Sequence, residues 1–382
     1  MRILVLGGDG YLGWPTSLRL SKLNHDVLTV DNYIRRDLFK KTNSKLLYEV
    51  PLLSQRVNAW KSISGKHVNF FEGDLSDWDF IEKIIKDFNP EAVVHFAEQP
   101  SAPLSMMNAE YANFTLINNI SVTMNLIHAV HLHAPSAHII KLGTMGEYGT
   151  PNIDIEEGWI TVEHKGRSDK FLYPRQASSL YHTTKIMDTD LLWFYVRTWG
   201  LKVTDLMQGP VYGIFTDEAN TPDLLTTFAY DEIFGTVLNR FITQAVLGVP
   251  LTVYGAGGQT RGYLNIKDTL NCIEIALKNP PSTGDMNIFN QFTETFSVNE
   301  LAEKVKKAGD KIGLAVEINH LENPRKEKER HYYNPAHTAL KSLGLKPNYL
   351  TENTIIECME FVRKYKDEVD VNLIFKGKKW FA

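Results

Sequence analysis

The stretch Ile3-Leu4-Val5-Leu6-Gly7-Gly8-Asp9-Gly10-Tyr11-Leu12-Gly13 decides the fold of this chain. Its four apolar residues predict a buried strand, and the glycines that follow allow a tight turn before a helix begins. Backbone N–H groups in such a turn approach a pyrophosphate closely, and the helix N-terminus adds partial positive charge. A glycine-rich turn alone also serves ordinary tight turns, so the prediction of a dinucleotide site depends on a surrounding β–α–β unit. The contacts that we expect are Gly7, Asp9, Gly10, Tyr11, Leu12 and Gly13.

Short β-branched runs alternate with longer helical patterns through the first half of the chain. The alternation predicts an α/β fold with a Rossmann-type, doubly wound parallel sheet. The expected strands are Ile3–Leu6, Asp26–Val30, Val68–Glu72, Ala92–Phe96, Ile139–Leu142 and Lys202–Leu206. The expected helices are Trp14–Lys22, Trp78–Asp87, Phe114–His133 and Tyr181–Trp199.

The composition changes after about Met207, where glycine, proline and aromatic residues become more frequent. We therefore expect a dinucleotide-binding domain at residues 1–207 and a smaller, discontinuous C-terminal substrate-binding lobe at 208–382. A strand-like piece at Met286–Gln291 is expected to return to the first domain, as part of a returning segment at about 262–291.

Composition excludes several classes of function. The chain has 382 residues, a net charge of −4 and mixed charge signs, which do not form the basic footprint of a nucleic-acid-binding protein. Cys272 and Cys358 lie far apart, so neither a disulfide framework nor a cysteine-based zinc site is expected, and we expect no metal. No apolar run reaches the roughly 20 residues of a membrane span. The chain opens directly on a strand, without a targeting segment, and the expected location is cytoplasmic.

The identity of the dinucleotide is indicated by Asp31, at the end of the second strand and about 20 residues beyond the glycines. A carboxylate there accepts hydrogen bonds from the adenosine ribose and repels a 2′-phosphate, which favours NAD over NADP. Arg35 and Arg36 follow and leave the alternative open, since arginines accommodate that phosphate, although a solvated loop or a pyrophosphate clamp explains them equally. Further expected contacts are Asn32, Asp74 and Leu75, with helix capping as the alternative for Asp74.

A candidate catalytic pair is formed by Tyr181 and Lys185, four residues apart on one face of a predicted helix. A nearby ammonium favours the phenolate, which predicts a lowered pKa for a tyrosine acting as a base. Lys185 is also positioned to bind the nicotinamide ribose. An amphipathic helix with one surface lysine is the alternative. Thr144 follows a strand end, where ligands bind in open α/β sheets.

The N-terminal glycines together with Thr144, Tyr181 and Lys185 resemble the extended short-chain dehydrogenase/reductase superfamily. The resemblance runs over essentially the whole chain. It implies that the three side chains move hydride between NAD and a hydroxyl-bearing carbon.

The segment after Thr144 separates members of this superfamily. Nucleotide-sugar 4,6-dehydratases have an Asp-Glu pair there, whereas this chain has Met145-Gly146 and then Glu147. The 4-epimerases also lack that pair, but longer stretches resemble the UDP-sulfoquinovose synthases, which make UDP-sulfoquinovose from UDP-glucose and sulfite with tightly held NAD. These stretches are Gly7–Trp14, Val94–Gln99, Ser101–Pro103, Lys141–Gly158, Tyr173–Ser179, Phe234–Thr236, Leu238–Phe241, Leu251–Leu264, Phe289–Glu294, Asn323–Arg325 and His331–Tyr333.

The resemblance implies a 4-keto and then a 4-keto-5-ene intermediate, with NAD recycled. Glu147 and His182 are the candidate elimination bases, with a structural loop carboxylate and a packed histidine as the alternatives. Met145 is expected to form an apolar wall, or simply to pack. The plant-type pattern has an arginine between Gln99 and Ser101, whereas this chain has Pro100 there. If that arginine positions sulfite, this chain must handle sulfite differently or use another hydrogen-bond donor.

A UDP-sugar requires cations for its diphosphate and flat contacts for its uracil, and the C-terminal lobe offers both. Arg261 and Arg325 are expected to bind phosphate oxygens, with surface salt bridges as the alternative. Further expected substrate contacts are Thr144, Gln208, Arg240, Thr252, Tyr254 and Gln259.

Two other functions stay open on the sequence alone. One is a UDP-glucose 4-epimerase or another UDP-hexose-modifying enzyme, and the other is a catalytically inactive NAD-binding regulator. The resemblance implies UDP-glucose and sulfite as substrates and a second copy of the chain packed through Phe114–His133 and Tyr181–Trp199, and a sulfite-donating protein is a further expected partner. The product would enter a membrane sulfolipid or a glycan.

Overall fold

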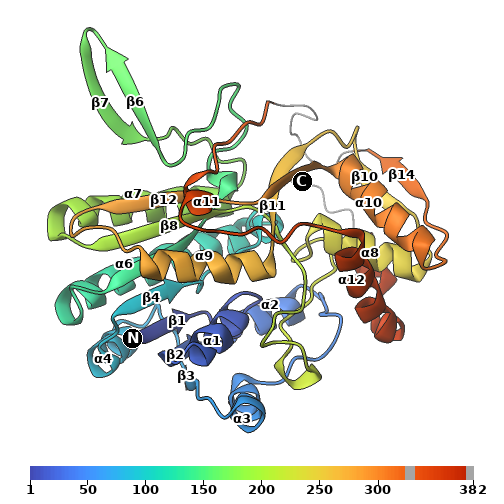
Figure 1. Cartoon of the computed structure of the whole chain (residues 1–382), viewed down its shortest axis with the longest axis horizontal. Coiled ribbons are helices and arrows are strands. Elements are labelled where there is room, and N and C mark those ends of the chain that lie inside the picture. Colours follow the sequence, from blue (N-terminus) through green and yellow to red (C-terminus); the bar gives the residue numbers. More distant parts are fainter. Residues whose placement is uncertain (323–331, 376–382) are drawn as a thin grey trace.

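A seven-stranded parallel sheet forms the centre of the computed structural model, which describes residues 1–322 and 332–375 (Figure 1). Its strand order is β12-β8-β5-β4-β1-β2-β3, with the first strand inside the sheet and the chain winding outward from it in both directions. This order confirms the predicted doubly wound Rossmann-type sheet. The strands are β1 (Arg2–Leu6), β2 (Asp26–Asp31), β3 (Asn69–Glu72), β4 (Ala92–His95), β5 (His138–Thr144), β8 (Lys202–Gln208) and β12 (Met286–Gln291).

Helices cover both faces of this sheet, and each face has its own apolar core. On one face, Ile81, Leu126 and Leu192 pack against the strands, and on the other face Trp14 and Ile273 do so. Burial on both faces explains why the strands read as continuous apolar runs. The first layer contains α4 (Trp78–Phe88), α6 (Ala109–His133) and α7 (Leu180–Trp199), and the second contains α1 (Gly13–Lys22), α3 (Leu53–Ser64) and α9 (Ile266–Lys278).

The four predicted helices are present, and α6 begins earlier than the sequence suggested. Asn108 caps it by accepting a hydrogen bond from the backbone N–H of Tyr111 (2.9 Å), so the first turn starts at Ala109. The predicted returning strand at Met286–Gln291 pairs with β8 as the edge of the central sheet.

The C-terminal part has a separate apolar core, in which Phe241, Leu301 and Met359 are fully buried. Its helices are α8 (Val237–Leu247), α10 (Val298–Lys311) and α12 (Glu352–Lys364). Its small sheets contain β9 (Val211–Tyr212), β10 (Leu251–Tyr254), β11 (Thr260–Asn265), β13 (Glu294–Ser297) and β14 (Ile318–Leu321). This lobe lies beyond the carboxyl ends of β1 and β4, so that residues from both parts face the same space (Figure 1).

A β-hairpin that the sequence analysis did not predict projects from the body (Figure 1). Most of its residues are exposed, so no buried face leaves a strong pattern in the sequence. Trp159 anchors the hairpin by packing edge-to-face on Trp193 of α7, with ring centroids 4.9 Å apart. The hairpin consists of β6 (Trp159–His164) and β7 (Arg167–Leu172), and the remaining short helices are α2 (Ile34–Lys41), α5 (Ala102–Ser105) and α11 (Ala339–Ser342).

None of the helices in the described part of the chain is both long and apolar enough to cross a membrane.

Candidate active site

In the glycine-rich turn, backbone without side chains lies at the carboxyl end of β1. Gly7 adopts a φ of +88°, and a Cβ atom there would lie 2.8 Å from the carbonyl carbon of Phe96. A Cβ atom on Gly13 would lie 2.0 Å from the carbonyl oxygen of Gly7, so only glycine lets α1 begin this close to the strand. The cradle fits a dinucleotide pyrophosphate, whose phosphates require such close backbone approach.

Asp31 ends β2 beside this turn. Its Oδ2 accepts a hydrogen bond from the backbone N–H of Asp9 (2.8 Å), and its Oδ1 accepts one from Tyr33 (2.7 Å). Burial and the neighbouring Asp9 carboxylate raise the pKa of Asp31 to about 6. The carboxyl is therefore ionised at neutral pH, as binding of the ribose hydroxyls requires.

The two arginines after Asp31 have different environments. Nε and Nη2 of Arg36 donate hydrogen bonds to the two carboxylate oxygens of Asp9 (2.7 Å each). Buried Arg56 also forms an ion pair with Asp9. Arg36 thus serves the fold rather than a 2′-phosphate. Arg35 lines the cavity, and its Nε is buried without a hydrogen-bond partner among the described residues, which suits a ligand phosphate.

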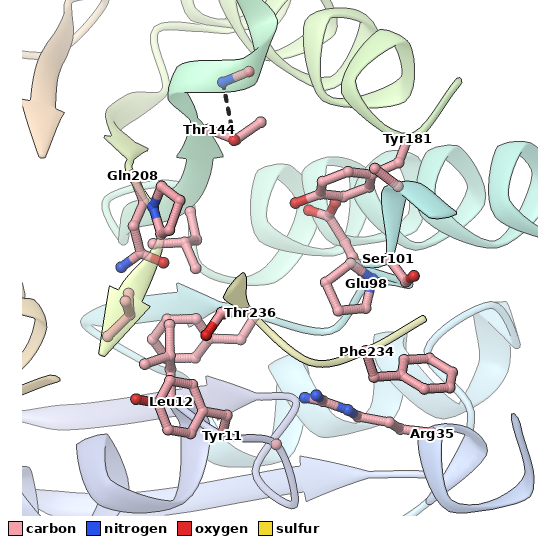
Figure 2. Close-up of a pocket in the computed structure, with 18 of the residues that line it drawn as sticks. Tyr11, Leu12, Arg35, Glu98, Ser101, Thr144, Tyr181, Gln208, Phe234 and Thr236 are labelled. Atoms are coloured by element: carbon pink, nitrogen blue, oxygen red, sulfur yellow. Dashed lines mark hydrogen bonds between the residues drawn. The ribbon is translucent and has the colours of Figure 1, made fainter. Parts of the chain in front are cut away.

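A cavity of about 590 Å³ extends from the glycine turn into the C-terminal lobe (Figure 2). It brings together almost all the residues expected to bind ligands. From the cofactor group it contains Gly7, Asp9, Gly10, Tyr11, Leu12, Gly13, Asp31, Asn32, Arg35, Asp74 and Leu75. From the substrate group it contains Thr144, Gln208, Arg240, Thr252, Tyr254, Gln259 and Arg261. Arg325 lies outside the described residues.

Thr144 and Tyr181 face the same space from the end of β5 and the first turn of α7 (Figure 2). Thr144 Oγ1 accepts a hydrogen bond from the backbone N–H of Gly146 (3.2 Å), which leaves the hydroxyl hydrogen available to a ligand. Met145 is buried and forms part of the cavity wall.

His182 also lines the cavity, next to Tyr181. The Ser179 hydroxyl contacts its Nδ1 (2.9 Å) and also caps α7. A Cβ atom on Gly146 would lie 2.4 Å from Nε2 of His182, so the glycine after Met145 makes room for the imidazole.

Lys185 is almost fully buried and is absent from the cavity-lining residues that the structure describes. Its ammonium forms an ion pair with Glu98 and lies 3.7 Å from Asp188. Burial alone would lower the pKa of Lys185, but these two carboxylates raise it.

The protein groups that the structure describes do not give the expected lowering of the Tyr181 pKa. Burial and the Glu98 carboxylate raise the pKa of Tyr181 well above its ordinary value. The ammonium of Lys185 is compensated by carboxylates, so it does not supply the unopposed positive charge on which the prediction depended.

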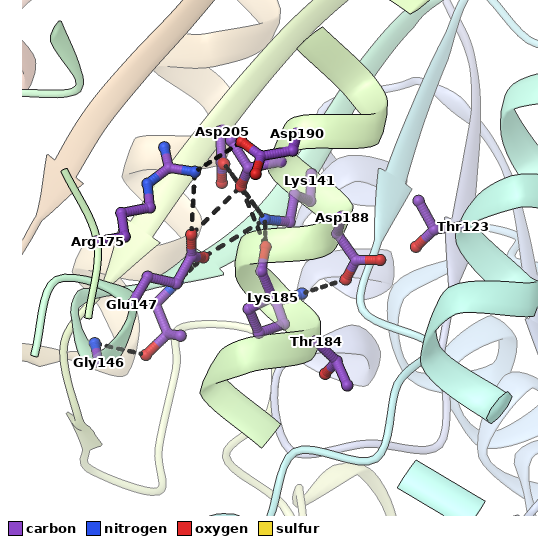
Figure 3. Close-up of polar contacts among 12 residues, drawn as sticks. Thr123, Lys141, Gly146, Glu147, Arg175, Thr184, Lys185, Asp188, Asp190 and Asp205 are labelled. Atoms are coloured by element: carbon purple, nitrogen blue, oxygen red, sulfur yellow. Dashed lines mark hydrogen bonds and ion pairs between the residues drawn. The ribbon is translucent and has the colours of Figure 1, made fainter. Parts of the chain in front are cut away.

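Glu147 lies outside the cavity and belongs to a buried polar cluster (Figure 3). Its Oε1 accepts a hydrogen bond from the backbone N–H of Thr144 (3.2 Å), and its Oε2 lies 3.5 Å from Nη1 of Arg175. Lys141 completes the cluster by pairing with both Glu147 (3.5 Å) and Asp205 (3.2 Å). This placement corrects the interpretation of Glu147 as an elimination base and agrees with the alternative, a structural carboxylate.

Glu98 is the principal site residue to which sequence reasoning gave no role, although it lies within the stretch Val94–Gln99. It lines the cavity and comes three residues after β4, at the same strand-end edge as Thr144. The strand prediction alone placed it at the ligand-binding edge. Other cavity residues that were not predicted as contacts include Ser101, Glu232, Phe234 and Thr236.

Comparison with known proteins identifies the family. Residues 3–290 match the NAD dependent epimerase/dehydratase family. The chain is 48% identical over 380 residues to a chloroplastic UDP-sulfoquinovose synthase of Spinacia oleracea, covering 99% of this chain and 79% of that protein. It is 44% identical over 383 residues to a UDP-sulfoquinovose synthase of Sulfolobus acidocaldarius, covering 100% and 98% of the two chains. This chain belongs to the UDP-sulfoquinovose synthase family.

Membership in the UDP-sulfoquinovose synthase family confirms the resemblance found in the sequence and the prediction of an NAD-dependent enzyme. The 4-epimerase alternative is not favoured, although the fold is shared. A UDP-glucose 4-epimerase from Stenotrophomonas maltophila, solved with bound NAD and formylated UDP-arabinopyranose, superposes with a TM-score of 0.75 at 19% identity. The alignment covers 97% of this chain and 100% of that chain.

Proposed function

We propose that this member of the UDP-sulfoquinovose synthase family converts UDP-glucose and sulfite to UDP-sulfoquinovose. The observation that carries the proposal is the presence of Thr144, Tyr181 and His182 in one cavity that also contains the glycine turn. NAD, held by the glycine turn and Asp31, would supply an acceptor for the hydride of sugar C4 and a donor for its return. The chain's own residues bind and orient the sugar and move its protons.

Tyr181 takes the proton of the sugar 4-hydroxyl as a phenolate, a form that the positive charge of a bound nicotinamide ring would favour over the phenol. The Thr144 hydroxyl donates a hydrogen bond to the same oxygen, while its Oγ1 accepts the N–H of Gly146. Together the two side chains orient the 4-hydroxyl so that a 4-ketone forms.

The 4-ketone acidifies C5–H, so water is lost from C5 and C6 and sulfite adds at C6 of the enone. His182 is the group that we assign to proton transfer at these steps, since its imidazole lies beside Tyr181 and works near neutral pH. Met145 gives C6 an apolar wall. Pro100 lines the cavity, so this chain presents no cation at that position to the sulfite.

The C-terminal lobe is proposed to hold the UDP group, with residues 1–207 holding NAD and 208–382 contributing most contacts to the substrate. Arg240 and Arg261 line the cavity as candidate diphosphate ligands. The Arg240 guanidinium lies over the Tyr254 ring, 5.3 Å from its centre, and forms a cation–π contact with it. Tyr254 and Thr252 form the expected border of the uracil, with Gln208 and Gln259 as further contacts.

A homodimer through α6 and α7 is proposed from the apolar side chains that these packed helices expose. Ile117 is 64% exposed, Met187 38% and Phe194 48%, and a partner packed on these helices would cover such side chains. Light scattering of wild type and Phe194→Asp tests this: the variant is expected to run as a monomer. A sulfite-donating protein is a further proposed partner, to be sought by adding candidate donors to an assay without free sulfite.

The proposed compartment is the cytoplasm. Its support is that Cys272 and Cys358 are both free and buried, as expected in a reducing environment. A fluorescent fusion followed in cells is the test.

The decisive experiment incubates purified protein and UDP-glucose with and without sulfite and identifies the products by mass spectrometry. A sulfonated UDP-hexose formed only with sulfite supports the proposal. UDP-galactose formed without sulfite would instead indicate an epimerase. Binding of UDP-glucose with neither NAD reduction nor product would indicate a regulator.

A further inference from the structure

The first turn of α7 is held by side chains from another part of the chain. The first backbone N–H groups of a helix have no acceptor within that helix. In α7, the N–H of Tyr181 donates to Oγ of Ser105 (3.1 Å). The N–H of Leu180 donates to the sulfur of Met106 (3.4 Å). Both acceptors lie at the end of α5, 76 and 74 positions earlier in the chain, so the backbone of Tyr181 is placed by α5 as well as by its own helix.

The Ser105 hydroxyl is fixed by a second hydrogen bond. It donates to the carbonyl oxygen of Ala102 (2.7 Å) while it accepts the N–H of Tyr181, and Ser105 is 1% exposed. A buried N–H that loses its acceptor destabilises the folded state, so this contact holds Tyr181 at a set distance from α5. Ser105 is not among the cavity-lining residues that the structure describes, so its effect on a ligand passes through Tyr181.

The other end of α5 belongs to the cavity wall. Ser101, Ala102 and Pro103 line the cavity, and Figure 2 shows Ser101 there together with the catalytic tyrosine. The Ser101 hydroxyl caps α5 by accepting the N–H of Leu104 (3.1 Å). The same hydroxyl donates to the carbonyl oxygen of Ile233 (2.5 Å), which lies in the C-terminal part of the chain. The short helix is therefore bonded at its beginning to one wall of the cavity and at its end to α7.

The segment that contains Ile233 leads to the part of the cavity proposed for the UDP group. Its neighbour Glu232 accepts a hydrogen bond from the Tyr254 hydroxyl. The Arg240 guanidinium lies over the same ring, and all four residues line the cavity. A continuous series of bonded residues thus joins the UDP side of the cavity, through α5, to the backbone of Tyr181.

We propose that α5 positions Tyr181 for proton transfer, with Ser105 as the positioning residue and Ser101 as the link to the UDP side of the cavity. The inference rests on the proposed function, in which Tyr181 takes the proton of the sugar 4-hydroxyl. When UDP is bound, the segment at Ile233 and α5 are held in one arrangement, and the Tyr181 oxygen keeps its distance from that hydroxyl. Without the Ser105 acceptor the first turn of α7 moves, and a displacement of about 1 Å at the reacting atoms costs roughly 100-fold in rate.

Three variants and a matched control test the proposal in the holoenzyme. Ser105→Ala removes the acceptor, Ser105→Thr keeps a hydroxyl, and Ser101→Ala removes the link to Ile233. Ser342→Ala is the control, because Ser342 also ends a four-residue helix, α11, and its hydroxyl also donates to a backbone carbonyl, that of Thr338 (3.0 Å).

The first measurement is amide hydrogen exchange in peptides from the start of α7, read by mass spectrometry, and it does not depend on turnover. We expect faster exchange at Tyr181 in Ser105→Ala, because this amide loses its acceptor, and wild-type exchange in Ser105→Thr and Ser342→Ala. Unchanged exchange in Ser105→Ala overturns the proposal. If Ser105→Ala does not fold, Ser105→Cys, whose thiol is a weak acceptor, is judged by the same outcomes.

The second measurement compares the rate of NAD reduction on mixing with UDP-glucose, without sulfite, with the affinity for UDP-glucose in calorimetry. Ser105→Ala is expected to be about 10- to 100-fold slower with unchanged affinity, because misplacing a proton acceptor affects the reaction more than binding. Ser105→Thr is expected to recover most of the rate. A wild-type rate in Ser105→Ala, or an equal loss of rate and affinity, overturns the positioning role.

The third measurement combines Ser101→Ala with Ser105→Ala and follows the same rate. If both serines act through α5, the double variant is expected to be little slower than the slower single variant. Rate losses that simply multiply would overturn the link between the UDP side and Tyr181. If wild type itself never reduces NAD with UDP-glucose, the proposed function fails first, whereas hydrogen exchange still judges the contact between Ser105 and Tyr181.

Discussion

Glu147 caps the strand end that carries Thr144. Its Oε1 accepts the backbone N–H of Thr144 (3.2 Å), and Thr144 Oγ1 in turn accepts the N–H of Gly146 (3.2 Å). The pair forms a capping box on the short 3₁₀ turn at residues 145–147. The carboxylate that seemed, by sequence position, to replace a dehydratase acid therefore fixes the geometry of the hydroxyl that binds the sugar.

Replacing Glu147 should act on stability more than on chemistry. Glu147→Ala leaves Arg175 and part of the charge of Lys141 buried without their partner, and we expect a loss of about 3–5 kcal/mol in the free energy of unfolding. Glu147→Gln keeps the hydrogen bond to Thr144 and should lose less. Denaturant unfolding measures both. A stable Glu147→Gln enzyme that reduces NAD but never loses water from the sugar would contradict this and restore Glu147 as the base.

The sequence predicted the parts of this molecule that depend on local patterns. The central strands and the return of Met286–Gln291 were predicted because buried strands and glycine-rich turns leave short-range signatures. The direction in which the Glu147 side chain points and the ion pair between Glu98 and Lys185 were not predicted. Glu98 and Lys185 are 87 positions apart, and no periodicity reports which side chains meet when two strand ends and a helix come together.

Tyr181→Phe should abolish formation of the 4-ketone without unfolding the protein. The phenolic oxygen is the proton acceptor of the first step, and general acid–base groups contribute roughly 10²–10⁴-fold to rate. The variant should still bind UDP-glucose in calorimetry but show no NAD reduction on mixing. Substantial NAD reduction by the folded variant would show that another group deprotonates the sugar.

Gly146→Ala should displace His182 and impair elimination more than oxidation. The new methyl carbon would lie 2.4 Å from Nε2 of the imidazole, which is closer than van der Waals contact allows. Because Gly146 donates to the capping hydroxyl of Thr144 through its backbone N–H, that hydrogen bond survives. We expect NAD reduction within a few-fold of wild type but much slower product formation with sulfite, followed by mass spectrometry. Equal losses in both steps would mean that the glycine supports the whole strand end and not the position of His182.

Affinity for NAD should fall with acidity because of Asp31. Its pKa is raised to about 6 by burial and by Asp9, so its carboxylate becomes protonated as pH falls through that value and no longer accepts both ribose hydroxyls as an anion. NAD binds the ionised form, and the dissociation constant should therefore rise by about tenfold per pH unit below 6 and stay flat above 7. Calorimetry on protein freed of NAD measures this.

Asp31→Asn provides the control for the acid dependence of NAD binding, because an amide does not titrate. It should bind NAD weakly and equally from pH 5 to 8, since it lacks the charge at every pH and still accepts the N–H of Asp9 through its side-chain oxygen. The native carboxyl is protonated in the folded chain between its unfolded pKa near 4 and about 6. In that window the folded state binds more protons than the unfolded state, so the wild type loses stability relative to Asp31→Asn as pH rises. A dissociation constant that rises below pH 6 in Asp31→Asn as steeply as in wild type would assign the titration to another group.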